Sequence, residues 1–194
     1  MKENNKISNY YKNSPVTLAL LAIIIIYFVV ITLNGGTTDS KTLVKFGALF
    51  PPYISTYNQY YRLVTSIFIH IGVAHLFFNA YALYIFGTQI EKVMGPKKYI
   101  LFFLITGIGG NIITYIFSFN TISAGASGSL FGILGAFLYL IRHHKNMITP
   151  EGRKSILSLL GLNLALTLLV PNISITAHFG GLIIGYIISF IFIK

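Results

Sequence analysis

Four polar side chains stand near the start of long apolar stretches of the chain, and their types suit the attack of a hydroxyl group on a carbonyl carbon. They are His75, Asn79, Ser127 and His178. A serine becomes a nucleophile when a nearby imidazole takes its proton, and hydrogen-bond donors stabilise the oxyanion that then forms. A polar group inside lipid needs a partner or a function, so these side chains are the first candidates for a catalytic site.

Ser127 lies in the sequence Gly-Ala-Ser-Gly, between Gly125 and Gly128, where an apolar run begins. Glycines let a substrate or another backbone come close, and the free amides of a first helical turn point to the place where an oxyanion forms. Gly128 and Gly132 also have the small-x-x-x-small spacing of packed membrane helices. For this motif alone, a nucleophile and a packing seam both remain open.

His178 shares a helical face with Gly181 and Gly185, which follow it at i+3 and i+7. Such a face can press closely against another backbone. If that backbone belongs to the helix that begins near Ser127, the imidazole reaches the serine hydroxyl as a general base. A structural histidine bonded to a carbonyl oxygen is the alternative. No carboxylate lies inside the apolar stretches, so the pair would be a dyad in which an aromatic or backbone group holds the ring.

His75 and Asn79 are four residues apart and therefore share one face of a helix. Both side chains can donate hydrogen bonds, which a developing oxyanion requires. The alternative is a polar clamp that joins two helices of the bundle.

The composition excludes several classes of function. Of 194 residues, 55% are hydrophobic and only 9% are charged, too few polar residues to cover a water-soluble globule. The net charge of +10 suits anionic lipid headgroups better than nucleic acid in so apolar a chain. No cysteine is present, and neither a metal-binding His-Glu-x-x-His motif nor any other metal or cofactor site is expected. The four acids all fall outside the apolar runs, which argues against an aspartyl protease or a proton pump: Glu3, Asp39, Glu91 and Glu151.

Six apolar runs are long enough to cross a bilayer as helices. They cover residues 16–33, 73–90, 99–119, 124–141, 156–170 and 173–193. The sequence therefore predicts an all-α, polytopic membrane protein with six transmembrane helices in one bundle. We expect residues 1–14 to form a short cytoplasmic tail and residues 15–194 to form the membrane domain. The tyrosine-rich connection between the first two runs suits the outer membrane interface.

The positive charges predict the orientation of the chain in the membrane. Eleven of the 14 Lys and Arg residues fall on the side that carries both termini, and only Lys41, Lys45 and Arg62 fall on the other. The positive-inside rule makes the first side cytoplasmic. The runs that begin near His75, Ser127 and His178 then all pass from outside to inside, so the three side chains reach a similar depth below the outer face.

The chain resembles the rhomboid intramembrane serine proteases over nearly its whole length. The matching stretches are Tyr61-Arg62, His70 with the run His75 to Asn79, the Gly125 to Gly128 motif, and the run Ala177 to Gly185. The resemblance implies that Ser127 is the nucleophile and His178 its base. It also implies that His75 and Asn79, with the Ser127 amide, bind the oxyanion, and that a six-helix core holds a water-filled cavity open to the outside.

Three positions bear on how far the resemblance reaches. Tyr61 stands where relatives usually have a tryptophan before the arginine, in a motif that is structural. Phe131 stands where relatives often have a tyrosine, so it can stack on His178 but cannot offer a hydroxyl. Glu91 matches a family acid near the inner end of the second helix, where we expect a structural role.

The expected activity is cleavage of transmembrane segments of other membrane proteins near the outer face of a membrane, which we expect to be a bacterial plasma membrane. Two alternatives belong to other classes of protein. One is a catalytically inactive relative that binds transmembrane clients, although such a protein would be expected to lack Ser127 or His178. The other is a transporter or channel, which the lack of intramembrane charge disfavours. The sequence indicates neither the substrate nor the oligomeric state.

Overall fold

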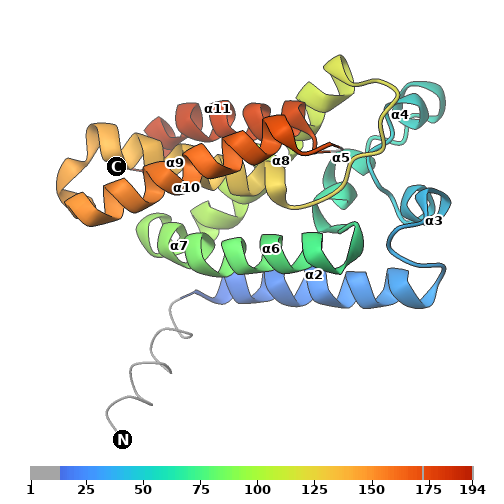
Figure 1. Ribbon diagram of the computed structural model, residues 1–194, viewed down its shortest axis with the longest axis horizontal. Coiled ribbons are helices and arrows are strands. Elements are labelled where there is room, and N and C mark those ends of the chain that lie inside the picture. Colours follow the sequence, from blue (N-terminus) through green and yellow to red (C-terminus); the bar gives the residue numbers. More distant parts are fainter. Residues whose placement is uncertain (1–13, 172, 194) are drawn as a thin grey trace, which may run out of the picture.

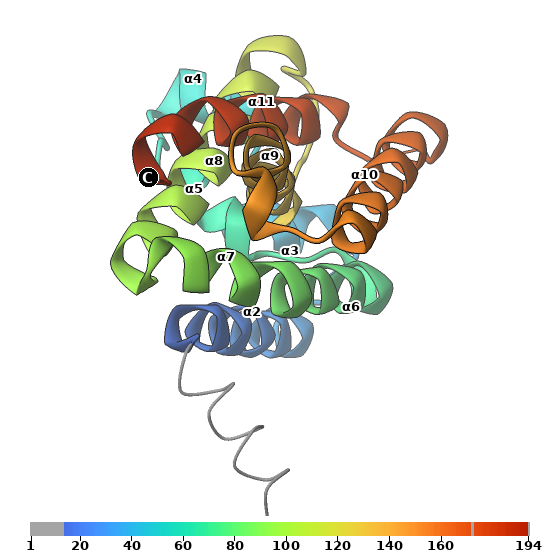
Figure 2. The same ribbon diagram turned by 90° about the vertical axis from the view of Figure 1, so that its left-hand side faces the viewer.

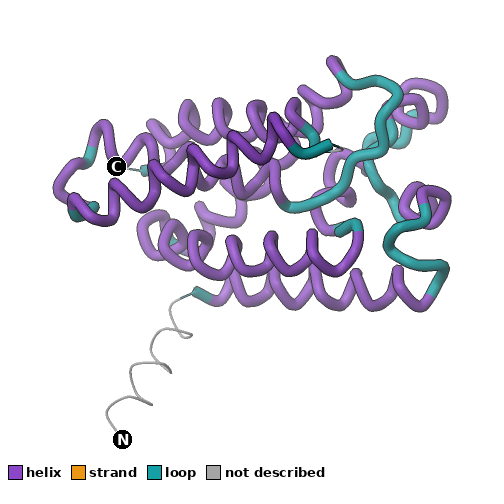
Figure 3. Tube along the Cα trace, in the orientation of Figure 1, coloured by secondary structure: helices purple, strands orange, loops and turns teal. Residues whose placement is uncertain are grey.

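The computed structural model describes residues 14–171 and 173–193, so nearly all of the predicted tail 1–14 lies outside the described residues. Every regular element in these ranges is helical, with one isolated bridge between Leu49 and Ser123 (Figure 3). The elements, in chain order, are α2 (Pro15–Leu33), α3 (Ser40–Lys45), α4 (Pro51–Tyr57), α5 (Arg62–Thr65), the 3-10 turn η1 (Ser66–Phe68), α6 (Gly72–Ala82), the π-helical turn η2 (Leu83–Gly87), α7 (Thr88–Met94), α8 (Pro96–Phe117), α9 (Ser127–His143), the 3-10 turn η3 (Lys145–Met147), α10 (Pro150–Leu169) and α11 (Ile175–Phe192).

The protein is an all-helical, polytopic membrane protein, and its long helices lie where the six apolar runs predict them. Within the described residues, four helices are long and apolar enough to cross a membrane alone: α2, α8, α10 and α11. The pair Arg62–Phe68 and Gly72–Met94, bent by 91°, qualifies as a fifth span or a re-entrant segment. The remaining long helix, α9, has 17 residues and is near the lower limit of length for a span.

Among the helix starts that differ from the predicted ones, those of α10 and α9 have identifiable reasons. Helix α10 begins at Pro150 and not at residue 156, because the Thr149 side chain caps it by accepting from the Gly152 amide at 3.1 Å. An apolar run does not reveal this charged first turn. Helix α9 begins at Ser127 and not at residue 124, because Gly125 has φ +132° and cannot join a helix.

Helix α9 is the centre of the bundle, and α8 and α11 pack directly on it (Figure 2). The contact between α9 and α11 is backbone on backbone: a β-carbon at Gly181 would overlap the Gly128 carbonyl oxygen, and one at Gly185 would overlap that of Gly132. A β-carbon at Gly110 of α8 would come within 2.7 Å of the Ala177 oxygen. The predicted close approach of the glycine faces is therefore confirmed.

A loop layer, residues 34–71, covers the end of the bundle at which α6, α9 and α11 begin (Figure 1). Arg62 holds this layer together from a buried position. Its guanidinium donates to the carbonyl oxygens of Val44 and Ala48 at 2.7 and 2.8 Å, and to the Gln59 side chain at 2.7 Å. These bonds confirm the structural role expected for the Tyr61-Arg62 motif.

Glu91 connects α7 to the start of α2, which lies beneath α6 and α7 (Figures 1 and 2). The buried carboxylate accepts hydrogen bonds from the amides of Val16 and Thr17 at 2.9 and 2.8 Å, and from the Thr17 hydroxyl at 2.7 Å. A negative charge at a helix N-terminus is favourable, so Glu91 supplies the cap that Ser14 does not. The expected structural role of this acid is confirmed.

Candidate active site

Ser127 is the first residue of α9, and hydrogen bonds hold the loop that precedes it in place. The Gly125 amide donates to the Ser66 carbonyl oxygen at 2.9 Å, and the Ala126 amide donates to His70 Nε2 at 3.4 Å. Further back, Leu49 and Ser123 exchange both backbone hydrogen bonds at 2.9 Å. The serine therefore enters its helix from a loop whose backbone is tied to the loop layer.

Gly125 is where His75 and Ser127 come together. A β-carbon at Gly125 would lie 2.8 Å from His75 Nε2 and 3.7 Å from Ser127 Oγ, so both polar groups flank one point. The positive φ of Gly125 and the nearness of the imidazole both exclude a side chain there. The predicted role of Gly125, to let groups approach closely, thus has a geometric basis.

The hydrogen bonding of His75 indicates which ring nitrogen carries its proton. Its Nδ1 accepts from the Ile71 amide at 3.3 Å. A neutral imidazole that accepts at Nδ1 carries its hydrogen on Nε2. The Nε2 hydrogen then lies on the side of Gly125 and Ser127, which suits a donor to an oxyanion.

Asn79 is buried one turn further along α6. Its Nδ2 donates to the His75 carbonyl oxygen at 2.9 Å, within the same helix, and its Oδ1 has no partner. Among the described residues Asn79 forms no hydrogen bond to another helix, so the interhelical clamp has no support at this side chain. One Nδ2 hydrogen remains to be donated.

The His178 imidazole is held on two sides. Its ring stacks on Phe131 of α9 with centroids 4.2 Å apart and planes 15° apart, which confirms that stacking survives the absence of a tyrosine. Its Nδ1 lies 2.8 Å from the Thr167 hydroxyl of α10. An aromatic group was expected to hold the ring, and the threonine is an addition that the sequence analysis missed.

The structure brings His178 against the first turn of α9, which begins with Ser127. Phe131 lies one turn after the serine, and the Gly128 carbonyl oxygen, next to the serine, meets Gly181, one turn after the histidine. In the described part of the chain, Ser127 Oγ has no hydrogen bond. The bond between serine and histidine therefore stays a prediction, and catalytic hydrogen bonds often tighten only when substrate binds.

His70 and Thr167 are the residues that the sequence analysis did not assign to the site. His70 is fully buried, and its ring centroid is 5.2 Å from that of His75. It lies outside the apolar runs, so a search for polar groups inside spans passes over it. Thr167 lies inside a run, but threonines are common in membrane helices and carry no signal of their own.

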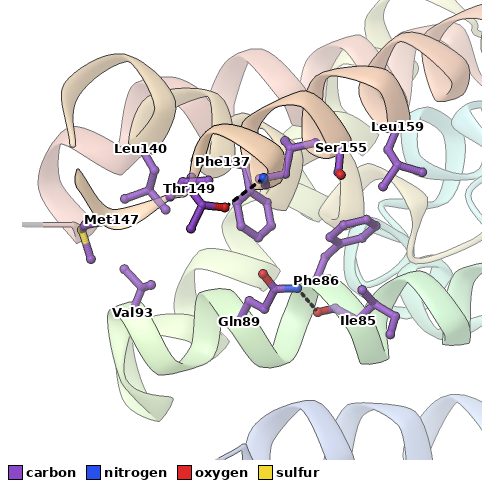
Figure 4. Close-up of a pocket in the computed structure, with 13 residues that line it drawn as sticks. Ile85, Phe86, Gln89, Val93, Phe137, Leu140, Met147, Thr149, Ser155 and Leu159 are labelled. Atoms are coloured by element: carbon purple, nitrogen blue, oxygen red, sulfur yellow. Dashed lines mark hydrogen bonds between the residues drawn. The ribbon is translucent and has the colours of Figure 1, made fainter. Parts of the chain in front are cut away.

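A separate cavity of about 430 Å³ lies between η2 and α7 on one side and α10 on the other (Figure 4). The part of α9 that lines it is the second half, including Phe137 and Leu140, so it is distinct from the place where Ser127 lies. Its walls are mostly apolar. Gln89 and Thr149 face it, and each bonds within its own segment: Gln89 to the Ile85 oxygen and Thr149 to the Gly152 amide.

Comparison with known proteins assigns the class of this helical membrane protein. Residues 57–194 match the Rhomboid domain family. The chain is 39% identical over 170 residues to Rhomboid protease GluP of Bacillus subtilis, an alignment that covers 88% of this chain and 33% of GluP. It is 36% identical over 155 residues to RHOMBOID-like protein 6, mitochondrial, of Arabidopsis thaliana, covering 79% of this chain and 50% of that protein.

The chain also shares 32% identity over 138 residues with YdcA of Bacillus subtilis, across 71% of this chain and 69% of YdcA. It thus spans about a third of the length of GluP and about half of the Arabidopsis protein. The protein described here belongs to the rhomboid family.

Proposed function

We propose that this protein is an intramembrane serine endopeptidase that cleaves transmembrane segments of other membrane proteins. The observation that carries the proposal is the position of the His178 ring, stacked on Phe131 beside the first turn of the helix that begins with Ser127. The name Rhomboid protease GluP, given to a relative, supports the same activity.

In the first step, Ser127 Oγ attacks the carbonyl carbon of a substrate peptide bond, and His178 Nε2 takes the serine proton. The carbonyl oxygen becomes an oxyanion. His75 Nε2–H, Asn79 Nδ2–H and the free Ser127 amide are the donors available to it. When the carbon–nitrogen bond breaks, His178 gives its proton to the leaving amine and an acyl ester remains on Ser127.

In the second step, water attacks the ester while His178 takes one of its protons. The carbon–oxygen bond to Ser127 breaks, the imidazolium returns the proton to the serine oxygen, and the new carboxyl product leaves. This step needs water beside Ser127, and a cavity open to the outside would supply it.

The substrate must expose a carbonyl from a segment that is helical in lipid. Small or helix-breaking residues near its outer membrane boundary should therefore be favoured. The bias of Lys and Arg supports an orientation with both termini of this chain in the cytoplasm and the start of α9 toward the outside, in what we propose is a bacterial plasma membrane.

The activity is tested with purified protein in liposomes that contain a single-span reporter. The wild type should cleave the reporter and react with a fluorophosphonate probe, and Ser127→Ala should do neither. Ser129→Ala is the matched control, because Ser129 is buried on the same turn and bonds the Phe103 oxygen at 2.7 Å. Equal cleavage by wild type and Ser127→Ala would refute the proposal.

The orientation has its own test, since the chain has no cysteine to confuse labelling. Thr56 lies exposed in the loop layer and Asn146 lies exposed between α9 and α10. In intact cells, a membrane-impermeant maleimide should label Thr56→Cys, and Asn146→Cys should be labelled only after permeabilisation. The reverse pattern would overturn the proposed orientation.

A further inference from the structure

The hydrogen bond between Thr167 and His178 joins two helices that otherwise have few contacts, α10 and α11. Thr167 is 2% exposed, so no bulk water competes for its hydroxyl. The Thr167 oxygen lies 2.8 Å from His178 Nδ1 and 2.7 Å from the carbonyl oxygen of Asn163, one turn earlier on α10.

The two partners of the Thr167 hydroxyl fix the direction of both hydrogen bonds. A hydroxyl has one hydrogen to donate, and the Asn163 carbonyl oxygen can only accept. The hydrogen therefore points to Asn163, and the Thr167 oxygen accepts from His178 Nδ1–H. A neutral imidazole has one N–H group, so the hydrogen on Nδ1 leaves Nε2 with its lone pair.

The other restraint on the ring cannot make this choice. Phe131 contacts the face of the imidazole and keeps its plane. Rotation of the ring by a half turn about the Cβ–Cγ bond would preserve the plane and the stacking, but it would exchange the positions of Nδ1 and Cδ2. A hydrogen-bond acceptor at one edge is needed to fix which edge carries Nδ1 and to hold the ring hydrogen on that atom.

We propose that Thr167 is the positioning residue of the base: it holds His178 in the tautomer and orientation that leave Nε2 free to take the Ser127 proton. The inference rests on the proposed function. A neutral hydroxyl takes the place that a carboxylate occupies in a Ser-His-Asp triad. When His178 becomes charged, its Nδ1–H bond to Thr167 becomes charge-assisted and strengthens, which favours the protonated intermediate.

The test compares Thr167→Val, which keeps the shape and removes the hydroxyl, with Thr167→Ser, which keeps the hydroxyl. In the liposome assay, Thr167→Val should lower kcat about 10- to 100-fold and leave KM within about twofold. Thr167→Ser should retain kcat within about threefold of the wild type.

Thr106→Val is the matched control. Thr106 is also buried and also bonds a carbonyl oxygen one turn earlier, that of Phe102 at 2.9 Å, but it has no bond to His178. Its kcat should match the wild type. Any of three results would overturn the inference. Thr167→Val could keep the wild-type kcat, Thr106→Val could lose as much kcat as Thr167→Val, or Thr167→Ser could be as slow as Thr167→Val.

A spectroscopic measurement keeps the proposal falsifiable if Thr167→Val fails to fold. In the wild type labelled with ¹⁵N-histidine, the His178 signals, identified by their loss in His178→Asn, should show hydrogen on Nδ1 at neutral pH. Hydrogen on Nε2 would overturn the inference. Ser127→Ala separates the two proposals: if it cleaves like the wild type, the proposed function fails, whereas an inactive Ser127→Ala beside an unaffected Thr167→Val refutes only the role of Thr167.

Discussion

Two parts of the bundle are built in opposite ways: the group α8, α9 and α11, and the single helix α10. In the first group glycines bring backbones into direct contact, and most of α9 is buried. In α10 only Ile156, Leu160 and Thr167 are buried, and a β-carbon at Gly161 would meet open space. Figure 2 shows α10 apart from the centre.

This difference in packing separates two requirements of the proposed catalysis: a fixed backbone for Ser127 and His178, and a hydrogen-bond partner for the His178 ring. The backbones that carry Ser127 and His178 are fixed by contacts that leave no room for movement, because close-packed atoms resist displacement. The hydroxyl that bonds His178 Nδ1 comes from α10, which borders a cavity and packs through a small apolar cluster of Phe131, Leu134 and Leu160. A shift of α10 would therefore change the state of the proposed base, His178, without moving the proposed nucleophile, Ser127.

The largest expected difference between the two parts comes from adding one methyl group to each, by a glycine-to-alanine substitution. Gly181→Ala should destabilise the protein by about 3 kcal/mol and lower activity about 100-fold, because the new carbon overlaps the Gly128 backbone. Gly161→Ala should be neutral or slightly stabilising. Equilibrium unfolding in mixed micelles and the reporter assay measure both, and equal effects would contradict the contrast.

A smaller effect is expected from truncating one apolar side chain in each part. Ile133 of α9 is fully buried, whereas Leu159 of α10 is 37% exposed beside the cavity. Ile133→Ala should cost about 2–3 kcal/mol because its packing contacts are lost, and Leu159→Ala less than about 1 kcal/mol. The same unfolding measurement ranks them, and a greater loss at Leu159 would mean that α10 is packed more tightly than described.

The smallest effect lies outside both parts, in the loop layer. Hydrogen bonds from the side chain and the amide of Thr42 hold the pKa of Asp39 below its ordinary value. Because the folded-state pKa is the lower one, this contribution to stability is complete above the unfolded pKa of about 3.9 and is lost as pH falls through the folded pKa.

Asp39→Asn removes this titration and keeps an oxygen to cap α3. When the pH is lowered from 7 to about 3, the unfolding midpoint should therefore fall slightly more in the wild type than in Asp39→Asn. Reporter cleavage at pH 7 should be the same in both. A larger pH effect in the variant would show that another group governs this range.

The sequence predicts the glycine contact well because its cause is local. Gly181 and Gly185 fall on the His178 face by helical geometry alone, and a helix with a glycine face tends to pack on another small-residue face. The position of Ser127 at a helix start is also predictable in kind, although the exact first residue depends on the backbone conformation of Gly125.

The Thr167 contact was not predictable for a physical reason. The hydroxyl of a threonine in a membrane helix usually donates to the carbonyl oxygen of the residue one turn earlier in the same helix. Thr167 does so as well, to Asn163. Its second bond, to His178, depends on how α10 is placed and rotated, which no pattern in this chain specifies. His70 was missed because its role is to accept from a loop amide that becomes a neighbour only in the folded chain.

The cap on α2 has a consequence for biosynthesis. The amides of Val16 and Thr17 find their acceptor 75 and 74 positions later in the chain. At about 5–20 residues per second, the first span waits roughly 4–15 s for Glu91 to leave the ribosome. Until then these two amides lack their acceptor in the folded protein, so α2 reaches its final contacts together with α7, and a nascent chain arrested before residue 91 would hold a first span without this cap.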